Sequence, residues 1–265
     1  MNMSHAADDG ARGSDPSPLW GVGGIVGVLV MWHLATATFG WVSPLTLPAP
    51  LGVLRQGVRL ATTNYNGTTL GENVWASLQV VLIGWSVGVV LGVPIGIAMG
   101  WNSTVRDYVN PLIEILRPIP PPAFIPFAVL WFGISPLGRI FVISLAAVMP
   151  CIINSYGAVR GCDQIIIDAA RCLGAGDKRI VAAVVVPTVA PEIIAGIRIA
   201  IGNAWMTVVA AELVASSAGL GFILIQAQYA IQPAVVLVSM ALIGLIGALL
   251  GILLGTVERR IGAWR

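Results

Sequence analysis

The side chains best able to do chemistry stand in two places in this sequence. In the first, an apolar stretch, Arg198, Trp205 and Glu212 recur every seven residues. That spacing predicts one narrow stripe along a helix, with Asn203 on a neighbouring face. One interpretation is a polar track lining a solute path, in which Arg198 attracts an anion. The other is that Arg198 and Glu212 extend to polar surroundings at opposite ends of the helix.

The second place is the charged stretch "DAARCLGAGDKRIVAAVVVP", residues 168–187. We expect Asp163 or an adjacent residue to cap a short helix, which ends at Gly174 because glycine suits a left-handed C-terminal cap. Asp177 is expected to cap a second helix, which Pro187 closes. The hairpin would pack through apolar side chains and turn basic ones to water. The apolar side chains are Ile165, Ile166, Leu173 and Ile180. The basic ones are Arg171, Lys178 and Arg179.

The signatures of several enzyme classes are missing from the sequence. Lys178 is the only lysine and follows Asp177, so there is no Gly-Lys-Ser/Thr phosphate loop. The only histidines, His5 and His33, cannot form a zinc-binding His-x-x-x-His pair, and Gly-x-Ser-x-Gly does not occur. We therefore expect a chain that is no enzyme and has no metal site.

The composition places those side chains in a membrane. Hydrophobic residues make up 57% of the 265 and charged residues 10%, whereas soluble domains have about 25% charged residues. An all-α integral membrane protein is expected, because backbone groups in lipid must bond internally. The net charge of +2 is too small to indicate a nucleic-acid partner. Reduced structural thiols are predicted for Cys151, Cys162 and Cys172.

Six spans of about 20 apolar residues can be placed. They are about 19–39, 73–100, 110–133, 137–159, 188–214 and 233–257. The third contains "RPIPPPAFIP", and proline removes a backbone donor and clashes with the preceding turn. Part of that span must therefore be broken, either at the membrane surface or where it lines a protein-covered cavity.

The basic residues predict the orientation, because Lys and Arg are more frequent in cytoplasmic loops. With both termini inside, residues 1–18 form a polar cytoplasmic tail, 19–257 the membrane domain and 258–265 a basic cytoplasmic tail. The outer segment 40–72 has room for a short helix at "VLRQGVRLA". Arg55, Arg59 and Arg139 then lie outside. The inner set is Arg12, Arg106, Arg117, Arg160, Arg171, Lys178, Arg179, Arg259, Arg260 and Arg265.

Glycines recur every fourth residue in two of the spans. They are Gly84, Gly88, Gly92, Gly96 and Gly100 in one, and Gly247, Gly251 and Gly255 in the other. Such spacing puts small residues on one helical face, where another backbone can approach closely. The partner helix can belong to the same subunit or to a second copy.

The charged stretch also resembles a known loop. Asp168-Ala169-Ala170, Gly174 six residues after Asp168, and Val184-x-Val186-Pro187 resemble the Glu-Ala-Ala…Gly…Ile-x-Leu-Pro loop of ABC importer permeases. There the loop forms the coupling helix that lies in a cleft of the ATPase subunit. This sequence departs from the pattern in its shorter acid and in its valines.

The resemblance covers about residues 40–262. "RPIPPPAFIPFAVLWFGIS" and "GIRIAIGNAWMTVVAAELVASSAGLGF" are similar to the nitrate, sulfonate, taurine and bicarbonate branch of these permeases. "SPLTLPAP", "GVPIGIAMG" and "ERRIGAW" look most like taurine permeases. The resemblance implies a type I ABC importer permease fold in the bacterial cytoplasmic membrane.

The resemblance further implies a homodimer, two ATPase subunits that bind ATP and Mg, and an extracytoplasmic solute-binding protein. Coupling through the loop at 163–187 would rest on Asp168, Ala169, Ala170, Arg171, Gly174 and Pro187. The translocation path would involve Phe124, Arg198, Asn203, Trp205 and Glu212. The solute expected is taurine or another small sulfonate, with nitrate, bicarbonate or an organic anion as alternatives. A stand-alone carrier or channel and a non-transporting scaffold are the other interpretations.

Overall fold

The computed structural model describes residues 18–65 and 67–262, and helices dominate them. In chain order they are α1 (Pro18–His33), the π-helical turn η1 (Leu34–Thr38), α2 (Pro50–Thr62), α3 (Leu70–Trp101), α4 (Ser103–Leu116), the 3-10 turn η2 (Pro121–Phe124), α5 (Ile125–Phe132), α6 (Pro136–Arg160), α7 (Gln164–Cys172), α8 (Asp177–Ile180), the π-helical turn η3 (Val181–Val185), α9 (Val186–Val214), α10 (Leu220–Tyr229) and α11 (Pro233–Gly262). The expected N-terminal tail lies almost wholly outside the described residues.

Polar residues start the long helices where the sequence supplies them. Thr69 and Glu72 form a reciprocal capping box at the start of α3. Asn102 accepts hydrogen bonds from the first amides of α4, which allows α4 to follow α3 almost without a loop. Ser135 caps α6 in the same way. Local capping therefore sets where the chain reverses direction.

Four helices are long and apolar enough to cross a membrane: α3, α6, the continuous helix Asp177–Val214 and α11. A fifth crossing results if α4 and the segment Pro121–Phe132 count as one span, and these are bent by 85° at the prolines. That bend confirms the predicted break. The first expected span coincides with α1 and η1, whose described apolar part, Gly23–Thr38, is shorter than a full crossing.

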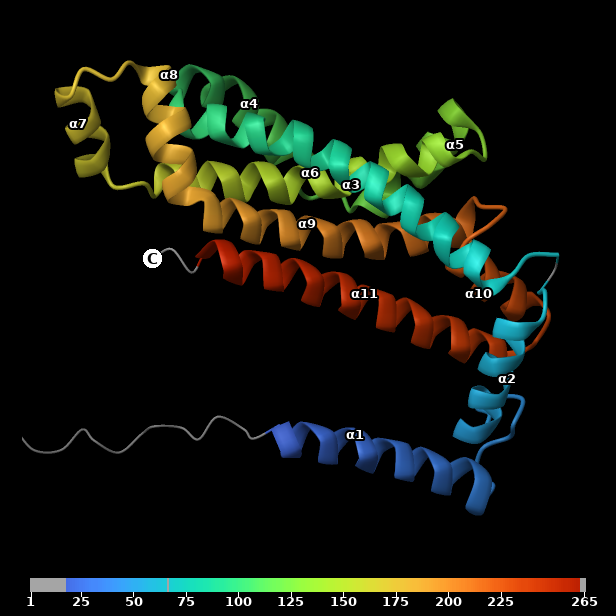
Figure 1. Cartoon of the computed structure of the whole chain (residues 1–265). Coiled ribbons are helices and arrows are strands. Elements are labelled where there is room, and N and C mark those ends of the chain that lie inside the picture. Colours follow the sequence, from blue (N-terminus) through green and yellow to red (C-terminus); the bar gives the residue numbers. More distant parts are fainter. Residues whose placement is uncertain (1–17, 66, 263–265) are drawn as a thin grey trace, which may run out of the picture.

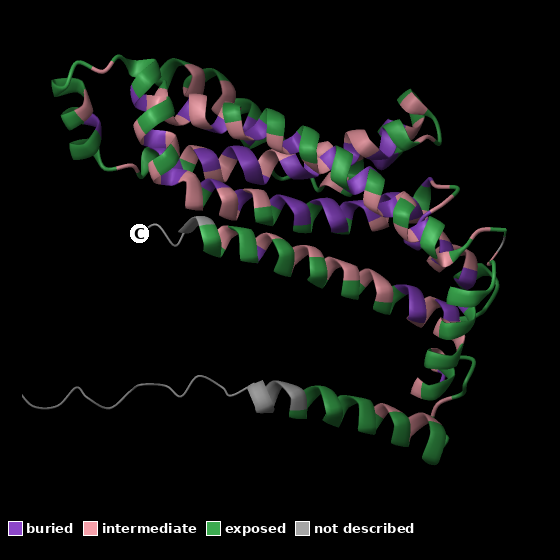
Figure 2. Ribbon diagram, viewed as in Figure 1, coloured by how far each residue is buried: buried purple, intermediate pink, exposed green. Residues whose placement is uncertain are grey.

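The spans lie side by side, with short helices at both ends (Figure 1). One end carries α7, α8 and the end of α11, and we call it the α7 end; α2 and α10 lie at the opposite end, the α10 end. Helix α2 is the short helix expected within 40–72. Buried residues concentrate in α3, α6 and α9, whereas α1 stands apart and its residues 23–33 are almost wholly exposed (Figure 2).

The α3 glycines bring α3 and α6 into close contact within one subunit. A Cβ added at Gly92 would lie 2.7 Å from Cys151 Cβ and 2.8 Å from the Val148 carbonyl oxygen. One added at Gly84 would lie 2.7 Å from the Ile143 side chain. Gly88, Gly96 and Gly100 meet α6 in the same way. The every-fourth-residue pattern of α3 therefore packs the core of the single chain.

The α11 glycines behave differently from one another. Gly247 faces the Trp205 ring, and Gly255 lies next to the Arg198 guanidinium, whereas Gly251 faces open space. Helix α11 also continues beyond the expected limit of 257, as far as Gly262. Most of the predicted C-terminal tail is thus the last turn of a helix, with Arg259 and Arg260 at its C-terminal end, where cations are favourable.

Candidate functional site

The segment between α6 and α9 folds as a helix and a glycine turn. The Asp163 carboxylate accepts a hydrogen bond from the Ile165 amide at 2.9 Å and caps α7, as predicted. Gly174 has φ +79°. The amides of Gly174 and Ala175 donate to the carbonyls of Arg171 and Ala170, the two bonds that define a Schellman cap. Gly174 therefore ends α7 as expected.

The second half of this segment differs from the prediction. Gly176, not Asp177, is the N-cap of α8, and Asp177 occupies the first turn of the helix. Pro187 does not close a helix, because Asp177–Val214 is one continuous helix with Pro187 inside it. The π-helical turn η3 directly before it takes up the disruption that a proline ring causes in a straight α-helix.

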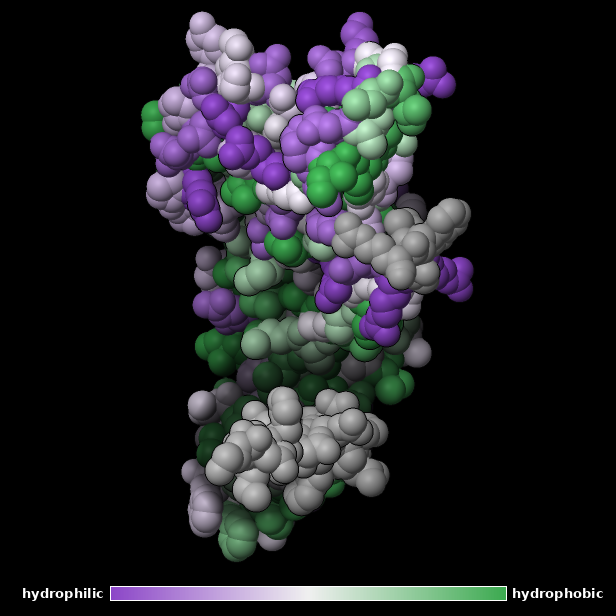
Figure 3. All heavy atoms as spheres, turned by 90° about the vertical axis from the view of Figure 1, so that its left-hand side faces the viewer, coloured by the Kyte–Doolittle hydropathy of each residue, from purple (hydrophilic) through white to green (hydrophobic). Residues whose placement is uncertain are grey.

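Helix α7 buries one apolar side chain and exposes others. Ile167 and Ile180 are buried in a cluster with residues of α6 and α9. Ile165 is 76% exposed and Leu173 88% exposed, so neither packs within this chain. Amphipathic spacing shows which residues share a face, but not which face the neighbouring helices cover. Figure 3 looks onto this end, where hydrophilic residues gather with hydrophobic ones among them.

The charges on α7 interact with one another and with α3. Asp168 accepts hydrogen bonds from Gln164 at 3.0 Å and from Arg171 at 3.2 Å. The Arg171 guanidinium carbon lies 6.0 Å from the centroid of the Trp101 ring at the end of α3, within reach of a cation–π attraction. Ala169 and Gly174 are exposed, and Ala170 is half-buried. The tip of α7 thus presents a fixed surface of mixed apolar and charged character.

The stripe on α9 does not form one exposed track. Arg198 pairs with Glu258 of α11 at 2.8 Å, and Trp205 is buried and donates to the Ile243 carbonyl of α11 at 3.0 Å. Glu212 is 1% exposed, so it does not extend to a membrane surface either. A sequence spacing of seven aligned the three residues, but the neighbouring helices give each a different partner.

Glu212 instead joins four helices near the α10 end. Its carboxylate accepts hydrogen bonds from the Ser77 hydroxyl at 2.7 Å and from the Gly221 amide at 2.9 Å. Asn73 accepts from the Gly219 amide at 2.8 Å, and Ser77 accepts from the Leu220 amide at 3.0 Å. Side chains from α3 and α9 therefore satisfy the free amides at the start of α10.

Arg139 completes this group, which we call the Glu212 cluster: Asn73, Ser77, Arg139, Glu212 and the amides of residues 219–221. The guanidinium lies 3.8 Å from the Glu212 carboxylate and donates to Ser216 at 2.9 Å. Arg139 is buried in the first turn of α6, near the α10 end. The residue spacing gave no signal for this cluster, because its members are far apart along the chain.

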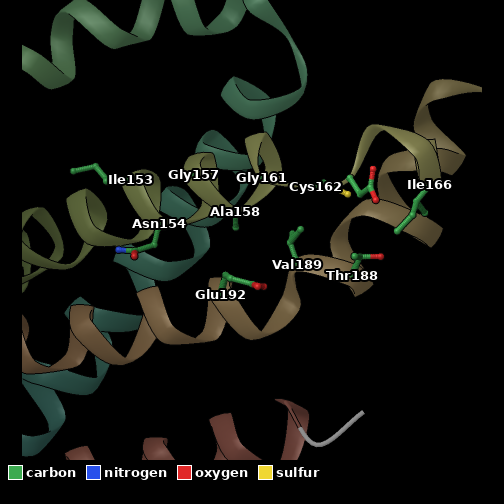
Figure 4. A pocket seen from close by; sticks show the side chains of 11 residues that line it. Ile153, Asn154, Gly157, Ala158, Gly161, Cys162, Ile166, Thr188, Val189 and Glu192 are labelled. Carbon is green, nitrogen blue, oxygen red and sulfur yellow. The ribbon is translucent and has the colours of Figure 1, made fainter. Parts of the chain in front are cut away.

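Two hollows lie along α6 and α9. The first, of about 580 Å³, is at the α7 end, where Asn154 of α6 and Glu192 of α9 line it together with Cys162 (Figure 4). Burial and the neighbouring Asp163 carboxylate raise the pKa of the Cys162 thiol. The second, which we call the central groove, has a volume of about 310 Å³ and shares Ile153 and Asn154 with the first.

The central groove brings together two of the predicted path residues. Phe124 of η2 and Asn203 of α9 both line it, and so does Arg117, at the C-terminal end of α4. Arg117, which the charge count assigned to the inner set, directly follows α4 at the bend of the broken span. The proline-rich motif marked the break, but the sequence did not reveal that Arg117 faces α6 and α9.

The sequence matches a known family and several named relatives. A family profile described as "Binding-protein-dependent transport system inner membrane component" matches residues 88–263. A probable ABC transporter permease of Brucella abortus is 41% identical over 88% of this chain and 90% of its own. The taurine transport system permease of Escherichia coli is 37% identical over 92% and 88%, and the nitrate import permease of Synechocystis 30% over 84% and 82%.

A similar fold is found among solved structures. The methionine ABC transporter in inward-facing conformations matches with a TM-score of 0.65. The match covers 72% of this chain and 95% of the other, at 22% identity. It therefore shows that the two chains share a fold.

Proposed function

This chain belongs to the family of binding-protein-dependent transport system inner membrane components, and on that premise we propose which solute it moves and how it is driven. It is a permease subunit of an ABC importer. As a homodimer it forms the passage for a small anion or zwitterion, of which taurine or a related sulfonate is preferred. A binding protein delivers this solute at the α10 end.

The single observation that best supports a coupled importer is the exposed tip of α7. Leu173 and Ile165 stand in solvent beside the Asp168–Arg171 pair. Ile167, Ile180 and the Schellman cap hold the helix in place. A rigid apolar tip with a charged flank is suited to a cleft on a soluble protein. The occupant we propose is the ATPase subunit, which binds ATP and Mg and leaves this chain without a cofactor.

The α7 end would then face the cytoplasm. Its basic residues support this orientation, because positive charge favours the cytoplasmic side. Among the described residues they are Arg106, Arg160, Arg171, Lys178, Arg179, Arg259 and Arg260, against Arg55 and Arg59 on α2 and the buried Arg139 at the start of α6. Both termini would be cytoplasmic, since α1 and α11 also direct them toward this end (Figure 1).

In the proposed cycle, the two ATPase subunits close on ATP and draw the two copies of the loop at 163–187 together. Asp168, Ala169, Ala170, Arg171 and Gly174 form or shape the contact, and Pro187 lies at the joint between the loop and α9. Because Asp177–Val214 is one helix, a force on the loop reaches the centre of the bundle as a rigid-body movement. Covalent chemistry stays in the ATPase.

The names of the relatives support the class of solute. The similar chains include taurine, aliphatic sulfonate and nitrate permeases, whose named solutes all carry an oxyanion group. We place the path along Phe124 and Asn203, which line the central groove. Arg198, Trp205 and Glu212 have partners in neighbouring helices, so we give them a supporting role. A stand-alone carrier is not favoured, because the family match is to a permease of a multi-subunit system.

The docking role can be tested with one substitution and a matched control. Leu173→Asp should leave the protein in the membrane but abolish co-purification of the ATPase in mild detergent. Leu45→Asp is the control, since Leu45 is also strongly exposed but precedes α2, at the opposite end. Equal ATPase recovery from both variants would refute the docking surface.

A further inference from the structure

One wall of the central groove carries the positively charged side chain of Arg117, near mid-height of the bundle. Helix α4 starts at the α7 end, and its 14 residues rise about 21 Å at 1.5 Å each, against a hydrocarbon core about 30 Å thick. The groove meets α6 between Leu145 and Asn154 and α9 at Ile199 and Asn203, near the middle of both helices. Arg117 therefore lines a hollow at the level of the middle of α6 and α9, two helices long and apolar enough to cross a membrane.

No carboxylate neutralises Arg117 among the described residues. The nearest acid along the chain, Glu114, accepts a hydrogen bond from Asn110 at 2.6 Å, and none of the ion pairs found there includes Arg117. A charged side chain at this depth is costly in lipid, so it faces protein, water or a counter-ion. The side chain is exposed into the groove formed with α6 and α9.

Two side-chain amides stand on the facing walls. Asn154 donates one of its amide hydrogens to the Pro150 carbonyl at 2.8 Å and keeps a second donor. Asn203 makes no side-chain hydrogen bond within the described part of the chain and is exposed into the same groove. The prolines of the bend lack amide hydrogens, so side chains supply the donors here. Phe124, Met149 and Pro121 form the apolar part of the wall.

We propose that Arg117, Asn154 and Asn203 form a binding site for a small oxyanion within the membrane, at the break between α4 and α5. The planar guanidinium pairs with two oxygens of a sulfonate, nitrate or carboxylate group, and the amides donate to the remaining oxygens. A hollow of about 310 Å³ accommodates such a group with a short organic tail on the apolar wall. This inference rests on the proposed function and assigns a site for its solute.

The test uses the complete transporter with its own ATPase and binding protein in proteoliposomes. Uptake of taurine, nitrate and bicarbonate is measured in parallel, and the solute imported by the wild type is then used. Arg117→Gln should lower uptake about 10- to 100-fold, because it removes a charge-assisted hydrogen bond. Arg117→Lys should recover part of the loss. Arg106→Gln is the control, since Arg106 is on the same helix but pairs with Asp107 at the α7 end.

A second variant separates binding from folding. Asn203→Asp keeps the size of the side chain but faces the anion with a carboxylate, and should lower uptake at least tenfold, whereas Asn203→Ala should lower it less. Amounts in the membrane and ATP hydrolysis stimulated by the loaded binding protein report whether the complex is intact. If the Arg117→Gln variant does not accumulate in the membrane, the uptake of the Asn203→Asp variant decides whether the oxyanion site exists.

The outcomes distinguish failure of the proposed importer function from failure of the oxyanion site. A wild-type complex that imports none of the three solutes and shows no stimulated hydrolysis contradicts the proposed function. If the wild type imports and both Arg117→Gln and Asn203→Asp import at its rate, the importer stands and the oxyanion site is refuted. Equal losses in Asn203→Ala and Asn203→Asp would also overturn it, because charge would then not matter.

Discussion

Substituting Gly92 by alanine should separate α3 from α6. The added Cβ would lie 2.7 Å from Cys151 Cβ and 2.8 Å from the Val148 carbonyl oxygen, whereas carbon atoms pack at about 3.5–4.0 Å. One of the two neighbours is backbone, so relief requires the helices to move apart by about 1 Å. That movement also loosens the contacts on either side, at Gly88 and Gly96.

The expected cost follows from overpacking of a close-packed core. Adding a methyl group where none fits costs about 1–3 kcal/mol, which corresponds to a fall in melting temperature of roughly 2–12 °C for a chain of this size. Gly251→Ala is the matched control, because Gly251 lies in a long apolar helix with the same glycine spacing and faces open space. There alanine should be neutral or slightly stabilising, by up to about 1 kcal/mol.

The assay is the loss of the monodisperse peak of the detergent-purified chain after heating, measured for the wild type and both variants. Gly92→Leu should be worse than Gly92→Ala, because a longer side chain needs more separation. If Gly92→Ala melts together with Gly251→Ala, within about 1 °C, the α3–α6 contact is not as close as the structure has it. The α3 glycines would then not serve packing inside one subunit.

Three further predictions concern the coupling loop, the Glu212 cluster and the cysteines. Gly174→Val should leave the chain in the membrane but reduce uptake driven by ATP, because φ +79° strains a branched residue by about 1–2 kcal/mol. Gly176→Val is the control and should be tolerated, because Gly176 has φ −77°. Equal uptake by the two variants would contradict this prediction. Glu212→Gln should destabilise the chain by about 1–3 kcal/mol, because an NH2 group replaces one of the two carboxylate oxygens, of which one accepts from Ser77 and the other from Gly221. Glu258→Gln, at an exposed pair, should cost below about 1 kcal/mol, and the melting temperatures test this. Exposed Cys172 should react with an impermeant maleimide added from the cytoplasmic side, and faster than half-buried Cys162. The raised pKa of the Cys162 thiol shifts its reaction to higher pH. Labelling of Cys172 from the outside would reverse the proposed orientation.

The sequence by itself determined the class of protein and most of its elements. A long run of apolar residues forms helices in lipid, because a helix satisfies its own backbone there, and so four spans and the broken fifth could be placed from hydropathy alone. The prolines after Arg117 predicted the break, and Asp163 and Gly174 predicted the ends of α7. These features depend on residues close together in the chain, so local rules suffice to read them. The resemblance of the charged loop then indicated the family.

Only the tertiary structure decided which side chains meet. Glu212 and Arg198 look equivalent in a seven-residue spacing, yet one is buried among Ser77, Arg139 and the start of α10, and the other pairs with Glu258 on α11. The sequence placed Arg117 next to the proline break, but only the packed structure shows that it lines one groove with Asn154 and Asn203. Hydropathy and spacing describe one helix at a time. The identity of the helix that covers each face depends on how all of them pack, because a polar side chain in a membrane is stabilised by partners that come from other spans.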